Sequence, residues 1–302
     1  MISVVIPTRD RTTRLHLTLS ALLAQTLDRD SFEVLLVDDA PRPGAVETVL
    51  AALPTGLPLR LARSGGRGVA AARNAGAGLA LGDLLLFLDD DTLADPDLLR
   101  AHLAAHTAPP PLPFTHTVAH SRVSDLTAFL FTADPLRFSR TLTGARGRTL
   151  APADLPTLPR LARTLGPRCS FIEGVARAVT GVPAYQELRW LACVGTGTSM
   201  SRALFERAGG FDEGFGALWG GEDLELGLRL AAAGAEFRLL DPAAYHLPQA
   251  RHHTGADLRR FWALVAQRHG RPRLERVGDF LRGDIGLDQL AAELAPTPQA
   301  AP

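Results

Sequence analysis

Three aspartates in a row follow a short apolar segment. Residues 84–92 read LLLFLDDDT, so Asp89, Asp90 and Asp91 stand at the end of a segment typical of a buried strand. Neighbouring like charges repel one another unless a cation lies nearby, and a helix cap would need only one aspartate. Hard cations such as Mg²⁺ or Mn²⁺ bind carboxylates, and Mg²⁺ usually keeps water and substrate phosphates as further ligands. The triplet therefore predicts a metal ion bound together with a phosphate group.

A second acidic cluster lies in residues 217–230, which read ALWGGEDLELGLRL. Its two glycines allow a tight turn before a helix that begins near Glu222. Acids in a first helical turn are favoured by the helix dipole, which by itself could explain Glu222 and Asp223. That explanation leaves out Trp219 beside the glycines, a combination suited to stacking against a sugar ring. We therefore favour a functional site here.

His246 is a third candidate. It follows a strand predicted over 235–240, in the sequence DPAAYHLPQARHH. A lone histidine is more often a surface or core residue than a ligand. Imidazole can nevertheless complete the coordination shell of Mn²⁺, and His246 would follow the last strand of the sheet.

Strands and helices alternate in the part of the chain that must position these residues. Leu15, Leu19 and Leu22 recur at helical spacing, Asp95-Pro96 resembles a helix start, and an alanine-rich helix is predicted over about 68–80. Strands are predicted over 2–8, 32–39, 57–63 and 83–88. This order predicts an α/β fold with a mostly parallel sheet covered by helices on both faces.

Ligands of such sheets bind beyond the carboxyl ends of the strands. Thr8-Arg9, Asp38-Asp39 and the aspartate triplet all stand at those ends. We therefore expect these three polar clusters to meet at one edge of the sheet.

The pattern changes after the first hundred residues. A proline-rich connection at 108–114 interrupts it, and the arginine-rich residues 134–168 fit an irregular surface as well as a lid or acceptor-binding segment. Regular structure is predicted to return at 191–200, followed by helices near 201–208 and over 222–233 and by a strand over 235–240. A helical, charged tail follows, and its last residues, APTPQAAP, are expected to be frayed.

Composition excludes several classes of function. The formal net charge is +0 with a pI near 7.1, which gives no general attraction to nucleic acid. Every basic side chain apart from histidine is arginine, so lysine chemistry is excluded. The two cysteines, Cys169 and Cys193, have no metal-ligand spacing and fit a reducing compartment. With no apolar run near the ~18 residues of a membrane span and an N-terminus that starts directly with a strand, we expect a soluble cytoplasmic protein.

Two other enzyme classes are less well supported. Residues 64–76, SGGRGVAAARNAG, imitate a dinucleotide fingerprint, but on the third strand and without further support for an NAD-dependent oxidoreductase. A phosphatase of the haloacid dehalogenase type would need Thr or Val at position 93, which is Leu93. It would also commonly need a lysine, which the sequence lacks.

Taken in order, four segments resemble family 2 glycosyltransferases of the GT-A fold. They read SVVIPTRDR, EVLLVDDA, GVAAARNAGAGLALGDLLLFLDDDT and GTSMSRALFERAGGFDEGFGALWGGEDLELGLRLAAAG. The last is similar to the carboxyl half shared by β-1,4-galactosyltransferases and polypeptide GalNAc-transferases, in which WGGED is distinctive. The resemblance covers roughly 2–100 and 190–247. It implies a GT-A domain over 1–247, with 108–190 as an acceptor-side insertion and 248–302 as a helical extension with a frayed tail.

The resemblance implies a metal-dependent inverting transfer of a sugar from a nucleotide-diphosphate donor, most commonly a UDP-sugar, with Mn²⁺ or Mg²⁺. The acceptor would be a hydroxyl of a glycan or lipid-linked molecule in polysaccharide or glycoconjugate biosynthesis, and a lipid-linked acceptor would bring peripheral contact with the inner face of the membrane. No nucleic acid partner is expected. An alternative is a non-catalytic sugar-nucleotide or carbohydrate-binding protein of the same fold, which would be expected to have lost Asp91 or Asp223.

The family pattern also implies roles for single residues. Those assigned to the nucleotide and donor sugar are Pro7, Thr8, Arg11, Asp39, Arg73, Asp89 and Asp90. Those assigned to the metal are Asp91, Asp89 and His246. Asp223 would be the general base, with Glu222 and Trp219 orienting the acceptor. The sequence departs from the pattern at Ser64, usually asparagine, and at Ala40-Pro41, usually glycine or asparagine followed by serine.

Overall fold

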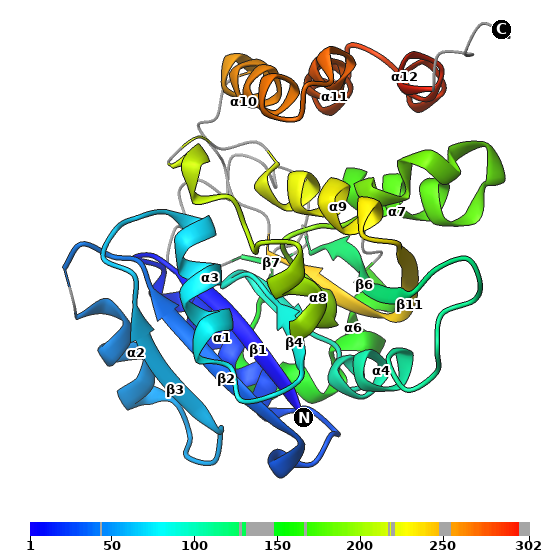
Figure 1. The fold of residues 1–302 in the computed structure, drawn as a ribbon. Helices are drawn as coiled ribbons and strands as arrows, with labels where there is room; N and C mark the ends of the chain where they lie inside the picture. The colour runs from blue at the N-terminus through cyan, green and yellow to red at the C-terminus, as the bar shows by residue number, and fades with distance from the viewer. Residues whose placement is uncertain are drawn as a thin grey trace, which may run out of the picture.

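A computed structural model describes residues 1–42, 44–126, 129–130, 148–165, 168–216, 218, 221–247 and 255–295. In this part of the chain the centre is a nine-stranded sheet, in the order β3-β2-β1-β4-β10-β6-β11-β5 with β9 beside β6. Figure 1 labels β1 to β4, β6 and β11 of this sheet. The first four strands along the chain are parallel neighbours: β1 (Ile2–Thr8), β2 (Phe32–Asp38), β3 (Leu59–Arg63) and β4 (Leu84–Phe87). The mostly parallel α/β sheet expected from the sequence is confirmed.

The second half of the sheet reverses direction at one strand. Strand β10 (Thr198–Ser201) is antiparallel to both of its neighbours, β4 and β6 (His116–Asp125). Strand β11 (Ala235–His246) runs parallel to β6, while β5 (Thr92–Ala94) and β9 (Arg168–Cys169) are short antiparallel additions. A separate pair is formed by β7 (Phe129–Leu130) and β8 (Arg148–Thr149). The reversal brings the chain that enters β10 to the edge where β4 ends.

Helices cover both faces of the sheet because its strands are apolar on both sides. In β1, Val4 and Ile6 pack with one hydrophobic cluster and Val5 with the other. The first cluster includes residues of α1 (Thr12–Leu23), α2 (Ala45–Ala52) and α4 (Leu98–Ala105). The second includes residues of α3 (Val69–Leu79), α7 (Phe171–Gly181), α8 (Arg202–Arg207) and α9 (Glu222–Ala232). Helix α6 (Leu158–Leu165) belongs to a third cluster.

The last described residues, 255–295, form three helices that pack into the same hydrophobic cluster as α9. These are α10 (Gly255–Arg268), α11 (Glu275–Arg282) and α12 (Leu287–Leu294). Phe261 and Trp262 of α10 belong to the same hydrophobic cluster as Leu224 and Leu228 of α9. Short 3₁₀ helices complete the structure: η1 (Arg29–Ser31), η2 (Pro152–Thr157), η3 (Pro183–Ala192), η4 (Glu213–Phe215) and η5 (Pro272–Leu274). None of the described helices has the length and apolar character that a membrane span requires.

Two element boundaries differ from the sequence predictions. Strand β11 does not end at residue 240 but continues through His246, because a bulge between Leu240 and Ala243 accommodates a proline that has no N–H to donate. Helix α4 begins at Leu98 rather than at Asp95-Pro96, since the Asp95 carboxylate accepts a hydrogen bond from the Asp97 N–H and closes a turn first. The final residues 296–302 and residues 134–147 and 166–167 of the arginine-rich segment lie outside the described residues.

Candidate active site

The three polar clusters meet at the carboxyl edge of β1, β2 and β4, as the sequence predicts. Thr8 Oγ1 donates a hydrogen bond to Asp90 Oδ2 over 2.7 Å, and the Asp39 N–H donates to the Thr8 carbonyl over 2.8 Å. Arg9 lies 4.0 Å from the Asp39 carboxylate. Parallel pairing of β1 with β2 and β4 is sufficient to bring these segments together.

Asp39 is held in position by two hydrogen-bond donors from the segment after β3. Ser64 Oγ donates to Asp39 Oδ1 over 2.5 Å, and the Gly68 N–H donates to Asp39 Oδ2 over 3.0 Å. Ser64 is one of the positions where the sequence departs from the family pattern. Its hydroxyl fixes the orientation of the carboxylate that the pattern assigns to the nucleotide.

Arg11 forms ion pairs with two members of the aspartate triplet. Its Nη1 atom lies 2.9 Å from Asp90 Oδ1 and 2.9 Å from Asp91 Oδ2. Burial raises the pKa of Asp90 to about 7, although Arg11 acts in the opposite direction. The Asp90 carboxylate contacts both Thr8 and Arg11, and the Asp90 backbone carbonyl accepts a hydrogen bond from the Thr18 hydroxyl.

His246 lies close to Asp91 because β11 pairs with both β5 and β6. The His246 Nε2 atom is 3.8 Å from Asp91 Oδ2, and Nδ1 is 2.8 Å from the Asp125 carboxylate. Asp125 and His246 are register partners at the ends of β6 and β11. Burial alone would lower the pKa of His246, but Asp125 and Asp91 raise it to about 9.

Asp125 was missed by the sequence analysis. It occupies the position of a carboxylate that accepts the second ring N–H of a metal-binding histidine and so fixes the direction of the free nitrogen. It lies in the segment 108–190, which matched no motif. Only the register of β6 against β11 brings it beside His246.

Asp91 and His246 are the described side chains that could hold a divalent ion together. The described part of the chain contains no group of three or more histidine, cysteine, aspartate or glutamate side chains arranged for a metal. One carboxylate and one imidazole leave the remaining positions to water and phosphate oxygens, which suits Mg²⁺ or Mn²⁺ arriving with a diphosphate. Asp89, the other expected ligand, contacts Arg73 instead.

Arg73 connects the aspartate triplet to the start of α9. Its guanidinium donates to Asp89 Oδ1 and to Glu222 Oε1, each over 2.8 Å, and lies 5.1 Å from the centre of the Phe211 ring. The Arg73 side chain is only 4% exposed. Burial alone would lower the pKa of Arg73, but Asp89, Glu222 and Asp223 raise it above its ordinary value. Arg73 thus links Asp89 to Glu222 through two ion pairs. The expected contact between Arg73 and a nucleotide stays a prediction.

Asp223 lies in the first turn of α9 with two backbone donors on its carboxylate. The Gly195 N–H donates to Oδ2 over 2.7 Å, and the Leu224 N–H donates to Oδ1 over 2.8 Å. Burial, followed by repulsion from Glu222, raises the pKa of Asp223 to about 6. A carboxylate that titrates near neutral pH is well suited to accept a proton in catalysis.

The loop before β10 supports both halves of this arrangement. Thr196 Oγ1 accepts a hydrogen bond from the Asp89 N–H over 3.1 Å and donates to Thr92 over 2.9 Å. Gly195 contacts Asp223 through its N–H, and a side chain at this position would collide with Arg73. The sequence signal was a threonine between two glycines, which does not by itself indicate this role. Trp219, expected to contact the acceptor, lies outside the described residues.

Comparisons with known proteins agree with this geometry. Residues 3–142 match glycosyl transferase family 2, and residues 180–253 match the family described as the N-terminal domain of galactosyltransferase. Validoxylamine A glucosyltransferase of Streptomyces hygroscopicus subsp. jinggangensis is 32% identical over an alignment of 256 positions, which covers 78% of this chain and 52% of that protein. The uncharacterized glycosyltransferase YfnE of Bacillus subtilis is 29% identical over an alignment of 247 positions, which covers 78% of this chain and 62% of that protein. The chain spans about half the length of the validoxylamine enzyme.

Solved structures confirm the fold. TarS of S. aureus, residues 1–349 in complex with UDP-GlcNAc, superimposes with a TM-score of 0.59 at 15% identity, covering 88% of this chain and 65% of that chain. The mannosyltransferase PcManGT of Pyrobaculum calidifontis, in complex with GDP-Man and Mn²⁺, has a TM-score of 0.54 at 18% identity, covering 97% and 78%. These likenesses and the sequence matches confirm the resemblance on which the glycosyltransferase class was expected. The chain therefore carries a family 2 glycosyltransferase domain of GT-A fold, followed by a galactosyltransferase-type C-terminal region.

Proposed function

We propose that the chain is a metal-dependent inverting glycosyltransferase that transfers a sugar from a nucleotide-diphosphate donor, with UDP-sugars as the first candidates. The observation that carries this proposal is the meeting of two half-sites at one sheet edge. Asp91 and His246 form the first, Asp223 and Glu222 form the second, and Arg73 bridges them through Asp89 and Glu222. The UDP-GlcNAc complex of TarS and the GDP-Man and Mn²⁺ complex of PcManGT support the choice of donor class and metal.

On the donor side, Asp91 and His246 would hold the divalent ion, with Asp125 fixing the direction of the imidazole. When bound, the ion supplies positive charge that stabilises the departing diphosphate. Asp39, held by Ser64 and Gly68, would bind the base or ribose. Pro7 and Thr8 lie on the same edge of β1 and would contact the nucleotide. Asp90 would support this side through its contacts with Thr8 and Arg11.

On the acceptor side, Asp223 would take the proton from the attacking hydroxyl. Its pKa of about 6 leaves it ionised at neutral pH and close enough in proton affinity to act as a base. Such general-base assistance is typically worth about 10²–10⁴-fold in rate. Glu222, fixed by Arg73, would orient the acceptor sugar together with Trp219. The acceptor class that the family implies is a hydroxyl of a glycan or a lipid-linked molecule.

The test is hydrolysis of a panel of UDP-, GDP- and dTDP-sugars in the presence of Mn²⁺, which reports the donor without requiring the acceptor. For the sugar nucleotide that is cleaved, Asp223→Asn should lower turnover by about 10²-fold or more while Mn²⁺-dependent binding of the nucleotide survives. Asp91→Asn should abolish that binding in calorimetric titration. Asp279→Asn on α11 is the matched acidic control. Unchanged metal-dependent nucleotide affinity in Asp91→Asn would remove Asp91 from its role.

A further inference from the structure

Helix α10 contacts the backbone immediately before the proposed catalytic residues. Trp262 is fully buried, and its indole lies against Gly221, where a Cβ atom would be 3.0 Å from Trp262 Cζ2. Gly221 has φ of +131°, a conformation that favours glycine. The indole therefore packs against the backbone of the residue directly before Glu222 and Asp223.

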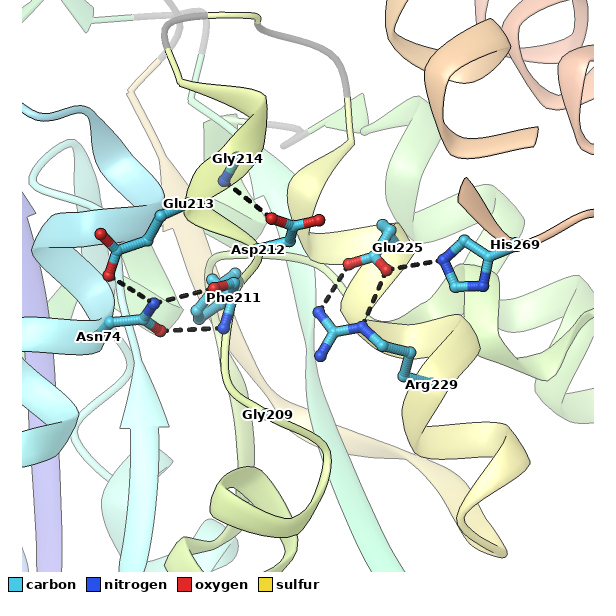
Figure 2. Close-up of a pocket in the computed structure, with 9 residues that line it drawn as sticks. All are labelled: Asn74, Gly209, Phe211, Asp212, Glu213, Gly214, Glu225, Arg229 and His269. Carbon is cyan, nitrogen blue, oxygen red and sulfur yellow. Dashed lines mark hydrogen bonds and ion pairs between the residues drawn. The ribbon is translucent and has the colours of Figure 1, made fainter. Parts of the chain in front are cut away.

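A second contact from the same part of the chain reaches the side of α9. His269, directly after α10, has its Nε2 atom 2.8 Å from Glu225 Oε1. Glu225 is 2% exposed and also accepts hydrogen bonds from Arg229 Nε and Nη2 over 2.8 and 2.6 Å. Figure 2 shows these three side chains directed toward one another along one wall of a pocket of about 570 Å³. Glu225 lies one helical turn after Glu222, so this contact fixes the rotation of α9.

A third contact holds the turn before α9. The Arg268 guanidinium stacks 4.6 Å from the centre of the Phe215 ring and donates to the Gly214 carbonyl over 3.2 Å. It also pairs with Asp212, and Phe261 lies 4.4 Å from Phe215, ring centre to ring centre. The contacts of α10 and of His269 just after it thus reach the first turn of α9 or the chain that enters it.

We propose that α10 and the residue after it act as a positioning element for the general base, with Trp262 and His269 as positioning residues. This inference rests on the proposed function. The matched family regions end at residue 253, so the helices that follow belong to neither match. A displacement of about 1 Å in a reacting group can cost on the order of 10²-fold in rate. Among the described residues, the Asp223 carboxylate accepts hydrogen bonds from the Leu224 N–H of its own turn and from the Gly195 N–H, and α10 is a separate support for that turn.

The experiment uses the full chain with paired variants. Trp262→Leu removes the flat contact with Gly221, whereas Trp262→Phe keeps an aromatic ring there. His269→Ala removes the donor to Glu225, whereas His269→Gln can still donate. Tyr185→Phe is the control, because it removes only the hydroxyl with which Tyr185 of η3 donates to Asp288 of α12. The readouts are kcat for hydrolysis of the donor found in the panel, Mn²⁺-dependent UDP affinity, and the thermal midpoint.

We expect Trp262→Leu and His269→Ala to lower kcat by about 10–100-fold with UDP affinity changed by less than about 2-fold. Trp262→Phe and His269→Gln should recover most of the lost turnover, and Tyr185→Phe should match the parent. An unchanged kcat in folded His269→Ala and Trp262→Leu, or parallel losses of kcat and UDP affinity, would overturn the inference. If Trp262→Leu does not fold, the histidine pair decides. Absence of Mn²⁺-dependent binding of UDP, GDP and dTDP in the parent chain would instead refute the proposed function, and this inference with it.

Discussion

Two charge-neutralising substitutions around Asp223 should move its titration in opposite directions. Repulsion from Glu222 is one cause of the raised pKa of Asp223, and attraction to Arg73 opposes it. Glu222→Gln removes a negative neighbour and should lower the pKa of Asp223, while Arg73→Met removes a positive neighbour and should raise it. A single nearby charge shifts a buried carboxyl by about one unit or more, which corresponds to about 1.4 kcal/mol per unit.

The sign of the activity change follows from the role of the base. Asp223 must be ionised to accept a proton, so turnover should rise with pH through about 6 and then level off. Glu222→Gln should move this limb of the kcat profile to lower pH by about one unit, and Arg73→Met should move it up by a similar amount. Asp223→Asn should remove the limb.

The assay is the initial rate of donor hydrolysis at saturating sugar nucleotide and Mn²⁺, measured from pH 4.5 to 8.5. The matched control is the Glu173 and Arg177 pair on α7, joined by a 2.6 Å ion pair, each neutralised in turn. Neither control should move the limb. If Glu222→Gln and Arg73→Met shift it in the same direction, or if it persists in Asp223→Asn, the titrating group is not Asp223.

Two other changes test the metal side and the packing of α9. Asp125→Ala should weaken Mn²⁺ binding in the presence of UDP by about 10–100-fold, because the imidazole loses the carboxylate that fixes its direction. The measurement is calorimetric titration with Glu173→Gln as control, and equal affinity would remove Asp125 from this role. Gly227→Ala should cost about 1–3 kcal/mol of unfolding free energy, since its Cβ would lie 2.5 Å from the Trp190 carbonyl oxygen. Chemical denaturation measures this loss, and Gly174→Ala, where a Cβ meets nothing within 4 Å, should not show it.

The meeting of polar residues at the carboxyl ends of β1, β2 and β4 could be predicted from the sequence because it depends on local patterns. Each strand from β1 to β4 is a short apolar run, and parallel pairing then requires their polar ends to meet. Contacts that depend on how two distant strands align with each other cannot be predicted from local sequence patterns. Asp125 reaches His246 only because β6 and β11 pair residue by residue, and the proline after Asp241 concealed the true length of β11. The anchoring of α9 by Trp262 joins segments that share no motif.

The antiparallel strand β10 fixes where the chain rejoins the sheet after residues 108–190. The Gly197 N–H donates a hydrogen bond to the Phe87 carbonyl over 2.8 Å. The chain that follows residues 108–190 therefore lies beside the end of β4, directly before the three aspartates. Because Gly195 and Thr196 directly precede this attachment, the pairing of β10 with β4 sets their position beside the aspartates.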